Sequence, residues 1–187
     1  VRVHDRTAPG EPRLLSLELV GVGRGKTLSP VPPGQVVCDG ARVEIRRPGL
    51  LEWYLNSPEG LEQGFTLAQR PPGEGPLVFE LALTGSQLRV AGQELRITTA
   101  TGRQLAYGAL LAVDAGGAAV HARLEQSAAD RIALVVDDIG ARYPLTLDPL
   151  LTATADTQFE SDQVAALFGG SVAAAGDVNG DGYADLI

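Results

Sequence analysis

The stretch Leu77-Val-Phe-Glu-Leu-Ala-Leu-Thr84 decides the fold class of this chain. Its largest apolar residues occupy every second position, and alternate side chains of a β-strand lie on the same face. The same alternation recurs along the chain, at 15–19, 43–46, 88–90, 95–97, 120–125 and 143–148. The pattern predicts a series of strands that each bury one face.

Glycine and proline residues separate these segments, at 32–34, 39–40, 71–73, 91–92, 101–102, 115–117 and 139–140. Because such residues are typical of turns, strands would follow one another at intervals of about 8 to 12 residues. No helical stretch is long enough to act as a crossover. The sequence therefore predicts an all-β chain, with an antiparallel β-sandwich or barrel over residues 14–149. The continuous apolar run from Ile132 to Val136 predicts a central strand buried on both faces.

The composition changes along the chain and predicts four parts. Residues 1–13 are polar and predict an N-terminal arm or a loosely held first strand. The all-β domain would end near Asp148-Pro149. Residues 150–162 are rich in Thr, Ala and Asp and predict a linker, and residues 163–187 would form a separate unit.

The ends and the hydropathy of the chain bear on its location. The sequence contains no Met and begins at Val1 without the basic and apolar regions of a signal peptide, so we expect a processed or trimmed product. No stretch approaches the roughly 20 apolar residues of a membrane helix, so we expect no membrane span.

Negative charge is concentrated in the C-terminal part of the chain. The net charge is −8, and no Lys or Arg follows Arg142. Seven of the 23 acidic residues lie after Arg142, which leaves 16 acidic and 15 basic residues before it. This distribution favours cation binding by the C-terminal segment and argues against nucleic acid as a partner. The alternative is an acidic tail that is only solvated. The seven acidic residues are Asp148, Asp156, Glu160, Asp162, Asp177, Asp181 and Asp185.

The spacing of oxygen donors from 177 to 185 predicts a calcium site. Calcium takes 6 to 8 oxygen ligands, and a short loop supplies them when donors recur at every second position. Gly182 permits the sharp turn that such a loop needs. The predicted metal ligands are Asp177, Asn179, Asp181, the backbone carbonyl of Tyr183, and Asp185.

The flanking residues distinguish this loop from an EF-hand, which begins in the same way. An EF-hand loop follows an amphipathic helix, whereas the paired glycines Gly169 and Gly170 disfavour a helix here. The residues after the loop, 184–187, are typical of a strand. We therefore predict that the loop joins two strands.

Two segments carry a resemblance to a known family. Phe168-Gly-Gly-Ser-Val172 followed by Gly176-Asp-Val-Asn-Gly-Asp-Gly-Tyr-Ala-Asp-Leu-Ile187 resembles the first half of an FG-GAP repeat. Such repeats form the blades of β-propellers in integrin α-subunits and in many secreted bacterial proteins. The resemblance implies a partial propeller blade in which the donors named above bind Ca²⁺ between two strands. A propeller needs several four-stranded blades, so this chain alone would not complete one.

The N-terminal part carries a second resemblance. Residues 52–67 and 142–149 are similar to a β-rich region that precedes FG-GAP repeats in large exported bacterial proteins. This resemblance implies an extracellular or cell-surface location and no particular activity.

Three further features resemble chemical sites, but their surroundings favour structural roles. The glycines of 21–27 lack the spacing of a phosphate loop and predict a turn between strands. His4 and His121 have no serine or cysteine partner nearby in sequence. Cys38, the single cysteine, is expected to be a buried apolar residue.

Carboxylates beside aromatic residues are the remaining signal for an enzyme or a sugar-binding site. Trp53 and Tyr54 have three glutamates near them in sequence, which are Glu52, Glu59 and Glu62. The preferred interpretation is a tryptophan in the core of the sandwich, with acidic residues in the adjoining loop.

These observations predict an exported, non-enzymatic, calcium-binding structural or adhesive protein. A protein partner or self-assembly is expected. One alternative is a subunit of an extracellular filament or surface assembly, since the open strands of an incomplete blade can pair with other chains. The other is a carbohydrate-binding module or hydrolase accessory domain, with a glycan as its ligand.

Overall fold

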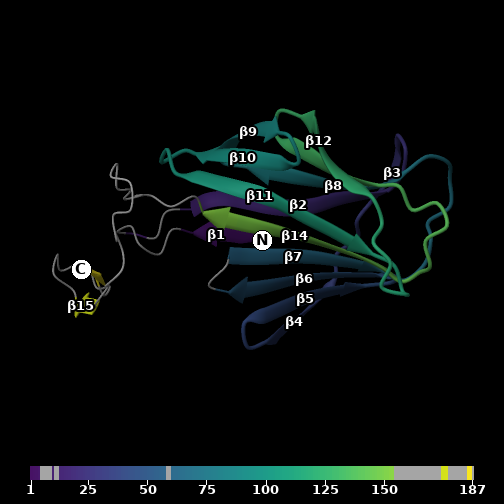
Figure 1. The fold of residues 1–187 in the computed structure, drawn as a ribbon, viewed down its shortest axis with the longest axis horizontal. Coiled ribbons are helices and arrows are strands. Elements are labelled where there is room, and N and C mark those ends of the chain that lie inside the picture. The colour runs from purple at the N-terminus through teal and green to yellow at the C-terminus, as the bar shows by residue number, and fades with distance from the viewer. Residues whose placement is uncertain (5–9, 11–12, 58–59, 154–173, 177–184, 187) are drawn as a thin grey trace, which may run out of the picture.

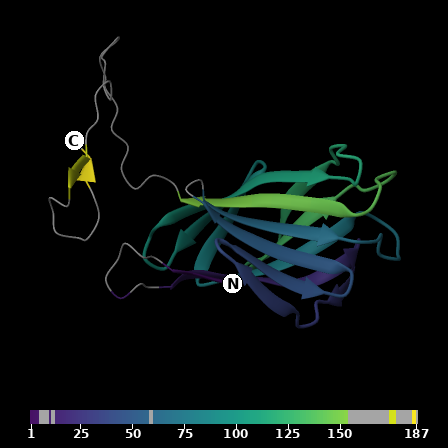
Figure 2. The same ribbon diagram turned by 90° about the horizontal axis from the view of Figure 1, so that it is seen from below.

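The computed structural model describes residues 1–4, 10, 13–57, 60–153, 174–176 and 185–186 of the chain. Every regular element among these residues is a β-strand (Figure 1). The strands form two large antiparallel sheets and one small one. The prediction of an all-β chain is confirmed, and of the two forms expected, sandwich or barrel, the described sheets form a sandwich (Figure 2).

The first large sheet has six strands in the order β1-β2-β8-β13-β12, with β3 paired to the second half of β2. Its members are β1 (Arg2–His4), β2 (Arg13–Arg24), β3 (Thr27–Pro30), β8 (Leu77–Thr84), β12 (Ala122–Ala128) and β13 (Arg131–Val136).

The second large sheet has eight strands in the order β4-β5-β6-β7-β14-β11-β10-β9. Its members are β4 (Gln35–Asp39), β5 (Arg42–Arg47), β6 (Leu50–Ser57), β7 (Gly60–Leu67), β9 (Ser86–Ala91), β10 (Glu94–Thr99), β11 (Gln104–Val113) and β14 (Leu145–Ala153). The small sheet pairs β15 (Ala174–Gly176) with β16 (Asp185–Leu186).

The core of the sandwich lies between the two large sheets, and β8 runs through its middle. Every second residue of β8 from Leu77 to Leu83 is at most 1% exposed, as its alternation predicts. The ring of Phe79 on β8 meets the ring of Phe65 on β7, with 5.2 Å between their centroids. This contact joins the two sheets at the centre, since β7 belongs to the eight-stranded sheet.

The strand β13 is buried on both faces, as its continuous apolar sequence predicts. Ile132 and Leu134 face the main core, whereas Ala133 and Val135 form a second, smaller cluster on the opposite face. Leu28 of β3 packs against that second cluster. A strand covered on both sides gains stability from apolar residues at every position, which explains the absence of alternation there.

The structure describes strands at both ends of the expected domain. Of the arm or first strand expected at the N-terminus, the structure has a strand, because β1 pairs with β2. At the other end, β14 continues through Pro149 to Ala153, past the boundary expected at Asp148-Pro149. A proline cannot donate a ladder hydrogen bond, but β11 bulges opposite this position, between Gly108 and Leu111. Ala109 in that bulge has a φ of 49°, so the strand continues at the expense of a local distortion.

A buried ion pair ties the loops at one end of the sandwich together. Arg24, at the end of β2, donates two hydrogen bonds to Asp138, and both side chains are 1% exposed. The same guanidinium donates to the carbonyl oxygens of Pro71 and Gly75. The hydroxyl of Tyr143 donates to Asp138 across 2.6 Å. The pair therefore holds the β7–β8 and β13–β14 connections against β2.

Removing the charge of Asp138 should destabilise the sandwich strongly. We expect Asp138→Asn to lower the free energy of unfolding by about 3–5 kcal/mol, because the Arg24 cation would stay buried without its counter-ion. Urea unfolding followed by circular dichroism measures this change. The matched control is Asp137→Asn, which removes an exposed carboxylate from the neighbouring position and should cause a much smaller change.

The pH dependence gives a second measurement of the same pair. Burial raises the pKa of the Asp138 carboxyl, but the hydrogen bonds from Arg24 and Tyr143 outweigh that effect, so the pKa lies below its ordinary value. The stabilisation is therefore complete above the unfolded pKa of about 3.9 and is lost as the pH falls through the folded value. Acid unfolding of equal steepness in the native chain and in Asp138→Asn would contradict this account.

Candidate functional site

The two strands of the small sheet flank the predicted calcium loop. Gly176 of β15 pairs with Asp185 of β16 in antiparallel register, which confirms the prediction that the loop joins two strands. Paired Cα atoms of antiparallel strands lie about 4.5–5.5 Å apart, so this pairing brings Gly176 and Asp185 close together. Of the predicted ligands, Asp185 lies in β16. Outside the described residues lie Asp177, Asn179, Asp181 and Tyr183.

The donor set of this loop fits calcium. It would offer three carboxylates, one side-chain amide and one backbone carbonyl, all of them hard oxygen donors, which calcium prefers. Among the described residues, no group of three or more His, Cys, Asp or Glu side chains is arranged to hold a metal ion.

Trp53 is buried, as the sequence predicts, but it lies on the outer face of the eight-stranded sheet and not in the cluster between the two sheets. Trp53 pairs with Gly64 across β6 and β7, whereas its neighbour Glu52 pairs with the core residue Phe65 on the inner face. The indole is nevertheless only 8% exposed. Two neighbouring residues cover the ring. It lies on Gly64 of β7, and the guanidinium of Arg42 on β5 stacks on it, 4.5 Å from the ring centroid.

This arrangement bears on the sugar-binding alternative. A tryptophan that binds a sugar presents one open face of its ring, whereas Gly64 and Arg42 cover the faces of Trp53. Of the three glutamates near it in sequence, Glu59 lies outside the described residues and Glu52 points into the sandwich. Glu62 lies outside the core and close to the carboxylate of Asp148. Burial, together with the charge of Glu62, raises the pKa of Asp148. The three glutamates therefore do not form one cluster around the indole.

Glu52 is instead the acceptor at the end of a buried hydrogen-bond network. It accepts hydrogen bonds from Arg47 at 2.7 Å, from the Tyr54 hydroxyl at 2.5 Å and from Gln63 at 3.4 Å. Gln63 also donates to the Tyr54 hydroxyl and accepts from Tyr107, each across 2.8 Å. Burial, followed by the charge of Glu52, raises the pKa of both tyrosines. The network is a neutralised structural unit, since every polar group in it has a partner.

Sequence reasoning missed this network because its members are far apart in the chain. Residues 50, 52 and 54 alternate along β6 and therefore share one face of the strand. The apolar Leu50 and Tyr54 on that face are the signal that could have predicted that Glu52 points inward. Gln63 and Tyr107 join it only through the pairing of β7, β14 and β11.

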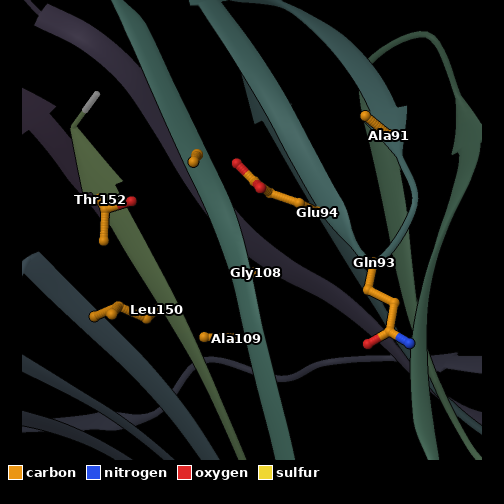
Figure 3. A pocket seen from close by; sticks show the side chains of 8 residues that line it. Ala91, Gln93, Glu94, Gly108, Ala109, Leu150 and Thr152 are labelled. Atoms are coloured by element: carbon orange, nitrogen blue, oxygen red, sulfur yellow. The ribbon is translucent and has the colours of Figure 1, made fainter. Parts of the chain in front are cut away.

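A hollow of about 410 Å³ lies on the outer face of the eight-stranded sheet, over β10, β11 and β14 (Figure 3). It forms because small residues of β11, Gly108 and Ala109, face Leu150 and Thr152 of β14 across the bulge. Glu94 is the charged residue in its lining. The hollow contains none of the residues that the sequence singled out as chemical.

The remaining sequence features lie in structural positions. Gly25 has a φ of 53° in the turn between β2 and β3, so the glycine turn is confirmed. His121 is exposed and lies 2.9 Å from Asp137. His4 is exposed on β1. The expectation that Cys38 is buried is wrong: it is exposed, because β4 is the outermost strand of its sheet.

Comparison with known proteins identifies the C-terminal segment. A family model described as the FG-GAP repeat matches residues 168–187. No curated protein and no solved structure matches the chain. The described residues include no helix that could cross a membrane. The resemblance to an FG-GAP repeat is therefore confirmed for this segment, which contains β15, the predicted loop and β16.

The contact of Trp53 with Gly64 predicts a strong effect of a single methyl group. A Cβ atom at Gly64 would lie 1.8 Å from the indole ring, so Gly64→Ala must displace the ring or the strand. We expect a loss of about 1–3 kcal/mol in the free energy of unfolding. Because Trp53 is the single tryptophan, its fluorescence reports the displacement directly, and we expect a red shift as water reaches the ring.

Gly108→Ala is the matched control in the same sheet. Its nearest neighbour would be the flexible side chain of Glu94, at 3.3 Å from the new Cβ atom. We expect little change in stability and no change in fluorescence. An unchanged emission maximum in Gly64→Ala would show that the indole does not lie on Gly64.

Proposed function

We propose that this chain is part of an exported, non-enzymatic, calcium-binding protein with a structural or adhesive role. In this proposal, the β-sandwich precedes an FG-GAP propeller whose blade loop binds Ca²⁺. The observation that carries the proposal is the spacing of oxygen donors from Asp177 to Asp185, inside the segment that matches the FG-GAP repeat. FG-GAP repeats occur in propeller domains of extracellular proteins that bind other proteins, which supports the location and the type of partner.

The charge distribution supports calcium as the bound ion. Three carboxylates of the loop, Asp177, Asp181 and Asp185, repel one another without a cation, and no Lys or Arg lies in the segment to neutralise them. Bound Ca²⁺ would supply that positive charge and fix the loop between β15 and β16. Asn179 and the carbonyl of Tyr183 would complete the protein ligands, and water would fill the remaining positions.

The polar groups of the sandwich support a role without catalysis. Arg47, Tyr54 and Gln63 all donate to the carboxylate of Glu52, which is 2% exposed. A general base needs access to substrate and a free lone pair. The carboxylate of Glu52 is buried, and its oxygens accept hydrogen bonds from three side chains. The ring of Trp53 is likewise covered by Arg42.

Calorimetric titration of the 187-residue chain with CaCl₂ tests the proposal. We expect one Ca²⁺ per chain, a rise in the melting temperature with added calcium, and weaker binding of Mg²⁺, which tolerates irregular oxygen loops poorly. The double substitution Asp177→Asn with Asp181→Asn should weaken calcium binding by at least about tenfold, or about 1.4 kcal/mol.

The matched control removes the same charge from the same acidic segment outside the loop. Asp156→Asn with Asp162→Asn should leave the calcium affinity nearly unchanged. An equal loss of affinity in both double variants would indicate a diffuse acidic tail. Absence of calcium binding by the native chain would refute the proposal.

A further inference from the structure

The outermost strand of the eight-stranded sheet, β4, has an open edge. It pairs with β5 on one side, and no other described strand pairs with it on the other (Figure 1). An unpaired edge presents backbone N–H and C=O groups that can bind another strand.

The inner face of β4 is also uncovered. Val36 pairs with Ile45 and Cys38 with Val43, and β5 in turn pairs these two positions with the inward residues Glu52 and Tyr54 of β6. Val36 and Cys38 would therefore face the core if the six-stranded sheet extended over them. It does not, since Val36 is 60% exposed and Cys38 is exposed as well. The open edge and an exposed apolar face thus occur on the same strand.

The opposite edge of this sheet, β9, differs in both respects. Its apolar residues Leu88 and Val90 pack against the core, and its outward positions include Arg89. Charged residues on an edge strand oppose pairing with other chains. Within β4, by contrast, the only charged residue is Asp39, at its end.

We propose that β4 pairs antiparallel with β4 of a second copy of this chain, about a two-fold axis at Val37. Only this register uses all five residues of the strand. Val36 of each copy then lies opposite Cys38 of the other on the inner face, which partly covers both. The two eight-stranded sheets become one continuous sheet.

Charge complementarity favours a second copy as the occupant. In this register, Asp39 lies opposite Gln35 of the second copy, an amide that can donate a hydrogen bond to it. Arg42 and Arg46 flank these two residues on β5, because they pair with Asp39 and Gln35 within each copy. No like charges lie directly opposite one another, and the outer face of β4 and β5 is neutral, with two acidic and two basic residues. The contact therefore brings no excess of negative charge together at the edge, although the whole chain carries a net charge of −8.

Sedimentation equilibrium of the full chain with EDTA tests this proposal independently of calcium binding. We expect a dimer whose dissociation constant rises at least about tenfold in Val36→Lys, because an inward charge at the edge opposes pairing. Val36 is mostly exposed, so the variant should keep the native melting temperature. The control is Ile139→Lys, which makes the same change at a residue 90% exposed in the β13–β14 loop and should leave the dimer intact.

The single cysteine gives a distance measurement for the same interface. Cys38 and its equivalent would be diagonal neighbours, about 7–8 Å apart between Cα atoms, so spin labels on them should broaden each other's spectra strongly. Val36→Lys should remove the broadening. A monomeric native chain at concentrations on the order of 1 mM would overturn the proposal. So would a dimer that survives Val36→Lys, or labels too far apart to interact.

Discussion

The packing of two sheets through the alternate residues of β8 is the constraint on which the rest of this structure depends. Leu77, Phe79, Leu81 and Leu83 are buried completely or nearly so. The contact between Phe79 and Phe65 joins the sheets at their centre. Because side chains alternate along a strand, this burial fixes the register of β2 and β13 beside β8. A shift by one residue would expose the apolar side chains that hold the sandwich together.

Two buried polar networks add to the apolar core by linking distant segments. Arg24 and Asp138 join the end of β2 to the β13–β14 loop, more than a hundred residues away. Glu52 accepts hydrogen bonds from a network that extends along the inner face of the sheet to Tyr107 on β11. Their net contribution to stability is modest, since burying each charge is costly. Because their directional contacts can form in one arrangement only, they favour a single position of the end loops and of β6 relative to β11.

The residues proposed to bind an ion lie outside the core of the sandwich, in the C-terminal segment. The sandwich is nearly neutral, and Glu52 and Trp53, the residues that suggested a sugar site, are held in structural contacts. The acidic residues with regular spacing lie in the FG-GAP segment. A division of roles follows, in which the sandwich supplies a stable platform and exposed strand edges, and the C-terminal loop supplies the proposed ion site.

The sequence by itself determined the all-β class, the alternating strands, the doubly buried β13 and the strand–loop–strand segment around 177–185, because these depend on local periodicity and spacing. Tertiary structure alone decided the surroundings of Trp53 and Cys38. Whether an apolar residue is covered depends on which strand lies beside it and on how far the opposing sheet extends. Gly64 and Arg42 cover the indole although it lies on the outer face of the sheet. Cys38 is exposed because β4 is the edge strand of its sheet and lies beyond the six-stranded sheet. The five residues of β4 do not by themselves indicate how far the opposing sheet extends.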